Sequence, residues 1–118
     1  MKKIYIASPY SSKSIGLRQL RYEQACEAAA YLMQRGYVVF SPIAHSHNIS
    51  KYLGNGNDCD FYLKQDLPLI EWADELWVLM LEGWQESNGI AAEIKYAITL
   101  GKPVQYFNIS GGKLEVLS

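Results

Sequence analysis

The run ELWVLML, residues 75–81, limits the possible folds of this chain more than any other segment. After its first residue it is continuously apolar, without the alternation of a strand that faces water on one side. A short strand of this kind is typical of a parallel sheet that helices cover on both faces. The run therefore predicts a central strand of an α/β fold.

Other strand-like and helix-like segments alternate around this run. Strands are also predicted at 3–8, 37–42 and 103–108, with a short last strand at 113–118. Helices are predicted at about 14–35, at about 58–73 and between a turn at 87–89 and Gly101, while the polar segment 43–57 resembles an irregular loop. Strands that alternate with helices form right-handed crossovers, so we expect a mostly parallel sheet of four or five strands.

The bulk composition favours one domain that acts on small molecules. A chain of 118 residues, taken here as a single domain 1–118, is long enough to bury its own core, and 49% hydrophobic residues argue against disorder. A net charge of −1 indicates neither a nucleic-acid partner nor a membrane partner. The apolar run in the start MKKIYIASPYSS is too short for a secretory signal and alternates like a strand, so we expect a cytoplasmic protein.

Three segments that follow predicted strands are rich in hydroxyl groups and aromatic rings. They read SPYSS, SPIAHSH and LEGWQESNG, and they begin at residues 8, 41 and 81. Ligands of open parallel sheets bind beyond the carboxyl ends of the strands, so these segments should meet at one rim. Trp84 in the third segment could stack on a base, and His45 in the second could contact a substrate.

Glu93 and Asp66 occupy similar positions on their predicted helices. At 100° per residue, Glu93 lies about 60° from Ile90 and Asp66 about 60° from Leu63, each at the edge of an apolar stripe rather than opposite it. The stripe beside Glu93 comprises Ile90, Ile94, Ala97 and Ile98. Two carboxylates at a cleft suit the cleavage of a glycosidic bond, since one attacks the anomeric carbon and the other handles the leaving-group proton. The alternative is a solvated glutamate near a helix N-terminus and an ordinary surface aspartate.

Several polar residues allow more than one interpretation. Ser87, Asn88 and Gly89 can cap the helix that they open, can seat an anion on its free N–H groups, or can do both. Arg18 and Arg21 are one turn apart on a helix, where solvation is the simplest interpretation. The spacing of His45 and His47 suits a metal, but no third ligand of convincing spacing follows, so we expect no metal.

Three segments carry a resemblance to a known family. IYIASPY, QDLPLIEWADELWVL and SNGIAAEIKYAITLGKPV occur in that order within roughly residues 3–106. Together they resemble the nucleoside 2-deoxyribosyltransferase superfamily, which includes transferases, deoxynucleoside 5′-monophosphate N-glycosidases and CMP or hydroxymethyl-CMP hydrolases. The resemblance implies a single-domain flavodoxin-like, Rossmann-like three-layer sandwich without a cofactor, usually dimeric or larger, with sites completed by a neighbouring chain.

The resemblance also implies roles for individual residues. Glu93 would be the nucleophile that attacks C1′ and forms a covalent glycosyl ester. We expect the N-terminus of its helix to keep it ionised at pH 7. Asp66 would assist the leaving base or hold the sugar, and Ser87 matches a position that binds 5′-phosphate in the monophosphate-cleaving members. Tyr10 would lie near the sugar, in a pocket lined by Ser8. The chain departs from the family pattern at Ser8-Pro9, where a Gly-[GS] pair is common, and in segment 43–57.

These observations lead to one main hypothesis and three rivals. The main hypothesis is an enzyme that cleaves the N-glycosidic bond of a nucleoside or nucleoside 5′-monophosphate, by hydrolysis or by base transfer, and that forms a homodimer or larger homo-oligomer. The first rival is a non-catalytic nucleotide sensor with the same pocket. The others are a metal-dependent hydrolase that uses His45, His47 and an aspartate, and an enzyme that cleaves NAD.

Overall fold

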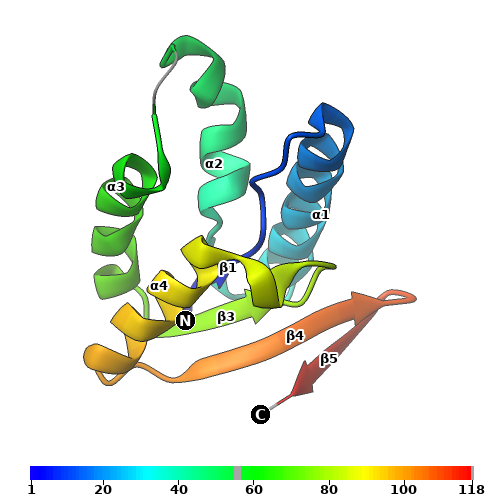
Figure 1. The fold of residues 1–118 in the computed structure, drawn as a ribbon. Helices are drawn as coiled ribbons and strands as arrows, with labels where there is room; N and C mark the ends of the chain where they lie inside the picture. The colour runs from blue at the N-terminus through cyan, green and yellow to red at the C-terminus, as the bar shows by residue number, and fades with distance from the viewer. Residues whose placement is uncertain (55–56, 118) are drawn as a thin grey trace.

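Five strands form one sheet in the order β2-β1-β3-β4-β5 (Figure 1). The computed structural model describes residues 1–54 and 57–117. The strands are β1 (Lys3–Ala7), β2 (Val38–Phe40), β3 (Glu75–Leu79), β4 (Val104–Ser110) and β5 (Lys113–Leu117). All neighbours pair in parallel except β4 and β5, which pair antiparallel. The prediction of a mostly parallel sheet is confirmed, although residue 118 of the predicted last strand lies outside the described residues.

Helices cover both faces of this sheet. They are α1 (Ile15–Gln34), α2 (Pro42–Ile49), α3 (Cys59–Trp72) and α4 (Asn88–Thr99), with short 3₁₀ turns η1 (Ser50–Tyr52) and η2 (Trp84–Glu86). One core contains side chains of α3 and α4 packed on β1 and β3, and a second core contains side chains of α1 packed on the opposite face. The fold is therefore the expected α/β three-layer sandwich.

Hydroxyl and carboxylate side chains begin all four helices. The side chains of Ser14, Ser41, Asp58 and Ser87 each accept a hydrogen bond from the backbone N–H three residues later. Such caps supply partners for N–H groups that the first helical turn leaves free. The boundaries predicted for α1, α3 and α4 agree with these caps to within about two residues.

The prediction of an irregular loop at 43–57 is wrong over most of its length. Residues 42–49 form α2 and residues 50–52 form η1, while 55–56 lie outside the described residues. Ser41 caps α2 and Pro42 occupies its first turn, where the fixed φ of proline suits a helix. The strand predicted to run to Pro42 accordingly ends at Phe40. Among the described residues, no helix is long and apolar enough to span a bilayer.

Candidate active site

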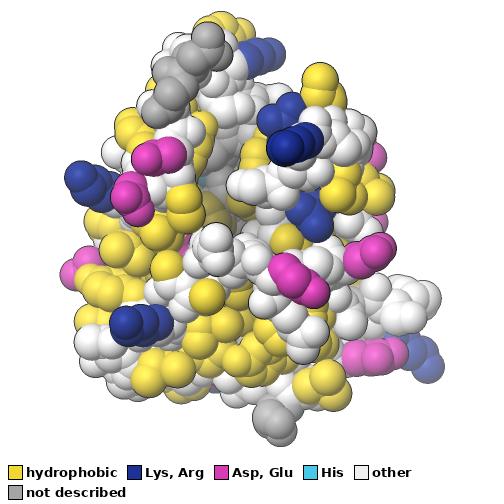
Figure 2. Space-filling model, in the orientation of Figure 1, with side chains coloured by type: hydrophobic (Ala, Val, Ile, Leu, Met, Phe, Trp, Pro, Cys, Tyr) yellow, Lys and Arg dark blue, Asp and Glu magenta, His cyan; other side chains and the backbone are white. Residues whose placement is uncertain are grey.

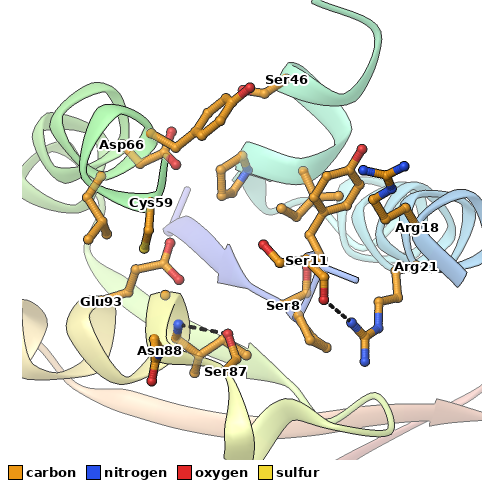
Figure 3. Close-up of a pocket in the computed structure, with 18 of the residues that line it drawn as sticks. Ser8, Ser11, Arg18, Arg21, Ser46, Cys59, Asp66, Ser87, Asn88 and Glu93 are labelled. Carbon is orange, nitrogen blue, oxygen red and sulfur yellow. Dashed lines mark hydrogen bonds between the residues drawn. The ribbon is translucent and has the colours of Figure 1, made fainter. Parts of the chain in front are cut away.

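A cavity of about 730 Å³ lies beyond the carboxyl ends of β1 and β3. Figure 2 shows the surface hollowed between α3 and α1, and Figure 3 shows side chains from α1, α2, α3 and α4 around this cavity. Seven of the nine predicted site residues line it, namely Ser8, Tyr10, Asp66, Ser87, Asn88, Gly89 and Glu93. The strand-end rim that the sequence predicts is therefore present as a cavity.

The side chain of Glu93 projects from α4 and is buried against the sheet. Its side chain is 6% exposed, and its Oε2 accepts a hydrogen bond from the hydroxyl of Tyr5 on β1. Tyr5 is fully buried among apolar residues of the sheet and of α3 and α4. Sequence reasoning missed Tyr5 because it lies in an apolar strand. Its hydroxyl was the available signal, because a buried tyrosine usually has a polar partner.

The protonation expected for Glu93 is wrong in this structure. Burial raises the pKa of Glu93 to about 8, the hydrogen bond from Tyr5 lowers it, and the nearby charge of Asp66 raises it further. The stabilising effect of a helix N-terminus is confined to the first turn, and Glu93 is the sixth residue of α4, which begins at Asn88. Burial therefore outweighs the helix dipole, and Glu93 is mostly protonated at pH 7.

Asp66 is the second buried carboxyl group of the cavity. It projects from α3, is 9% exposed, and has a pKa raised to about 6 by burial. The charge of each carboxylate disfavours the ionisation of the other. Between about pH 6 and pH 8 the two groups together hold one proton. The pair can therefore combine one carboxylate with one carboxylic acid near neutral pH.

The N-terminus of α4 forms another part of the cavity wall. The Ser87 hydroxyl accepts from the N–H of Ile90 at 3.2 Å, which confirms its role as a cap. Ser8 is 6% exposed, and its hydroxyl has no hydrogen-bond partner among the described residues. The proposed anion seat at residues 87–89 stays a prediction.

Arg18 and Arg21 both line the cavity, and the interpretation of Arg21 as a solvated side chain is wrong, because its guanidinium bonds two backbone carbonyls. Arg21 donates from Nη1 to the carbonyl of Ser11 and from Nη2 to the carbonyl of Glu82, each at 3.0 Å (Figure 3 shows the first bond). It thereby joins the segments that follow β1 and β3. Gly83, at φ +89°, fits beside it, since a Cβ there would lie 2.6 Å from Arg21 Nη2.

Trp84 and His45, although predicted as site residues, do not line the cavity. The ring of Trp84 packs against Tyr106 with centroids 5.5 Å apart, at the margin of the core below α4. His45 is exposed on α2, and the other histidine, His47, lines the cavity instead. Residues two apart on a helix point about 200° apart, so a helical α2 separates the two imidazoles. Within residues 1–54 and 57–117, no three His, Cys, Asp or Glu side chains form a metal-binding group.

Comparison with solved structures finds the same fold in 2-deoxyribosyltransferases. The chain superposes on that of Bacillus psychrosaccharolyticus with a TM-score of 0.63 and 27% identity, covering 98% of this chain and 77% of the other. For the enzyme of Leishmania mexicana the TM-score is 0.59 at 20% identity, covering 93% of this chain and 66% of the other. Both likenesses confirm a flavodoxin-like fold, and the first supports the resemblance at superfamily level.

Sequence comparisons are less informative about activity. No curated protein matches the chain significantly. Residues 2–109 match a protein family described as a domain of unknown function, DUF1937. The match covers most of the chain, and this protein belongs to the DUF1937 family.

Proposed function

We propose that this protein is an enzyme that cleaves the N-glycosidic bond of a nucleoside or nucleoside 5′-monophosphate. The observation that carries the proposal is the pair of buried carboxyl groups, Glu93 and Asp66, in one cavity at the strand ends. The likeness to the 2-deoxyribosyltransferase of Bacillus psychrosaccharolyticus supports the same class of reaction. Nothing in the chemistry below needs a cofactor or a metal.

The reaction starts from the form in which the proton of the pair lies on Asp66 and Glu93 is the carboxylate, a minor form near neutral pH because Glu93 has the higher pKa. In the first step a carboxylate oxygen of Glu93 bonds to C1′ of the sugar. The bond from C1′ to the base nitrogen breaks, and its electron pair leaves with the base. Asp66, in its acid form, gives its proton to the departing base or holds the sugar in place. Because Tyr5 engages Oε2 of Glu93, we assign the attack to Oε1.

In the second step the glycosyl ester is cleaved at C1′. Water attacks in a hydrolase, and a nitrogen of a second base attacks in a transferase. The Glu93 carboxylate leaves with the electron pair of the ester bond, and the attacking group gives a proton back to Asp66. Two displacements at one carbon retain its configuration.

Within this class, the other end of the cavity favours a 5′-monophosphate. Figure 3 shows Arg18 and Arg21 across the cavity from Glu93 and Asp66. Arginine binds phosphate well, and the first N–H groups of α4 add positive potential beside Ser87. A nucleotide could therefore place its phosphate near the arginines and C1′ near the carboxyl groups.

The test is base release by the purified chain. Ribo- and deoxyribonucleosides, their 5′-monophosphates and NAD are incubated with wild type, Glu93→Gln and the control Glu27→Gln on the exposed face of α1. We expect release by wild type and the control, and a loss of roughly 1,000-fold or more in Glu93→Gln. Chromatography after a second free base is added distinguishes transfer from hydrolysis.

Two other outcomes would favour the rivals. If no compound releases its base, and nucleotides bind tightly to both wild type and Glu93→Gln, the protein is a sensor rather than an enzyme. Activity that is lost in a chelator would favour a metal-dependent hydrolase.

A further inference from the structure

His47 is fixed from three directions. Its Nδ1 lies 2.8 Å from the Tyr10 hydroxyl, and its Nε2 lies 3.2 Å from Oε1 of Gln19 on α1. Its ring stacks on Tyr22, also on α1, with centroids 4.0 Å apart and planes 16° apart. The sequence did not predict these contacts of His47, because its partners are 25 or more positions away.

The hydrogen bonds of Gln19 determine which nitrogen of His47 carries the proton. The amide nitrogen of Gln19 donates to Oε2 of Glu23 at 2.9 Å, so its amide oxygen faces His47. That oxygen can only accept, and His47 Nε2 must therefore carry a hydrogen. In neutral imidazole Nδ1 is then an acceptor, which matches the Tyr10 hydroxyl as donor. Burial raises the pKa of Tyr10, so the phenol keeps its proton near neutral pH.

Tyr10 and His47 also separate two hollows of the surface. Both residues line the 730 Å³ cavity, and both line a second hollow of about 300 Å³ on the side of Gln19 and Lys51. The hollow leaves space into which the Tyr10 ring could turn if its hydroxyl were released. With the hydroxyl proton bonded to His47, Tyr10 presents its ring to the contents of the larger cavity.

We propose that His47 is a positioning residue that holds the ring of Tyr10 as a wall of the substrate cavity. Gln19 and Tyr22 keep the imidazole in the tautomer and orientation that accept the Tyr10 hydroxyl. The role in catalysis rests on the proposed function, whereas the pairing of Tyr10 with His47 does not. His47 acts on substrate binding through Tyr10 and takes no part in proton transfer to the reacting atoms.

The kinetic test compares His47→Leu, His47→Asn and Tyr10→Phe, with His45→Leu as the matched control outside the cavity. Loss of one hydrogen bond should raise KM roughly 3- to 10-fold in His47→Leu and Tyr10→Phe and leave kcat within about 2-fold. Asparagine keeps an acceptor near Nδ1, so His47→Asn should restore KM. The double variant Tyr10→Phe/His47→Leu should be no worse than either single variant, because both remove the same bond.

The structural test is ¹⁵N NMR of the ring nitrogens. The chain has two histidines, so His45→Gln leaves His47 as the one signal pair to assign. We expect the Nε2–H tautomer, with an Nδ1 shift that moves in Tyr10→Phe. This test needs no turnover and works on a protein that fails the base-release assay.

The two tests separate the failure of this proposal from the failure of the proposed function. An averaged or Nδ1–H tautomer, or unchanged KM in both His47→Leu and Tyr10→Phe, would overturn the positioning role. If wild type releases no base, calorimetric Kd values for the same nucleosides and nucleotides replace KM. Kd values that follow the expected pattern would support the role, and Kd values indifferent to His47→Leu, or no binding at all, would overturn it.

Discussion

At the scale of single residues, the proposed reaction depends on one proton held by two buried carboxyl groups. Asp66 has a pKa of about 6 and Glu93 a pKa of about 8, both raised mainly by burial. Below pH 6 both are protonated and no carboxylate can attack. Above pH 8 both are ionised and no acid remains for the leaving base.

We therefore expect kcat/KM for base release to follow a bell-shaped pH profile with limbs near 6 and 8. Asp66→Asn should leave one rising limb, the ionisation of Glu93, at a pH below 8 because the charge of Asp66 no longer raises the pKa of Glu93. A wild-type profile that is flat from pH 5 to pH 9 would contradict the shared proton.

Burial of Glu93 should also reduce the free energy of unfolding. In the unfolded chain Glu93 ionises near the ordinary glutamate pKa of 4.5, and in the fold its pKa is about 8, so the folded chain holds the extra proton. Stability is then lost as pH rises between these two values. Glutamine stays neutral, so Glu93→Gln should gain about 3 kcal/mol, or roughly 12 °C in Tm, between pH 5 and pH 8.

Thermal unfolding across this pH range measures the gain. Glu27→Gln, on the surface, is the control and should track wild type. If Glu93→Gln differs from wild type by the same Tm at pH 5 and at pH 8, ionisation of Glu93 does not destabilise the fold.

At the scale of secondary structure elements, the serine caps allow cavity and stability effects to be separated. Ser14, Ser41 and Ser87 begin α1, α2 and α4. Each change to alanine should cost about 1 kcal/mol of stability in chemical denaturation. Ser87 also lines the cavity and Ser14 does not, so Ser87→Ala should lose activity beyond its stability loss while Ser14→Ala keeps it. Equal activity of these two variants would remove Ser87 from the substrate site.

The elements that the sequence predicts well are those with a local pattern. The strand at 75–81 has a continuous apolar run, and the helices α1, α3 and α4 have apolar periodicity and capping residues within a few positions. Segment 43–57 follows the helix-start pair Ser41-Pro42, but its polar composition masked α2.

Site residues show the same division. Glu93 and Asp66 could be predicted because helical geometry sets their position beside a core stripe. Tyr5, Arg21 and His47 acquire their partners across 88, 61 and 37 positions of sequence, and no local pattern encodes such pairings. Trp84 illustrates the converse, since an aromatic residue in a rim segment can equally fold back onto the core.

At the scale of the whole molecule, apolar side chains remain at the surface. Figure 2 shows hydrophobic side chains gathered over α4 and β4. Ile98, predicted for the core stripe of α4, is 64% exposed, and Leu117 on the edge strand β5 is 58% exposed. Exposed apolar surface of this kind often marks a site of contact with another protein.

We therefore expect a homodimer or larger homo-oligomer in solution. Light scattering coupled to gel filtration should give at least twice the chain mass of 13.4 kDa. Ile98→Glu should shift the mass towards one chain if α4 lies in the contact, with Lys95→Glu as an exposed control on the same helix. A mass of 13.4 kDa for wild type at all concentrations would exclude a composite site.

The contact between Arg21 and Gly83 has a consequence for how this family can diverge. Position 83 has no room for a Cβ while Arg21 bridges the two loops, and its positive φ favours glycine, asparagine or aspartate. A Cβ at position 83 would therefore displace the guanidinium of Arg21, the mobile end of its side chain, from the carbonyl of Glu82 and loosen the bridge between the two loops. Among relatives, these two positions should change together, as an epistatic pair that joins the history of two otherwise separate loops.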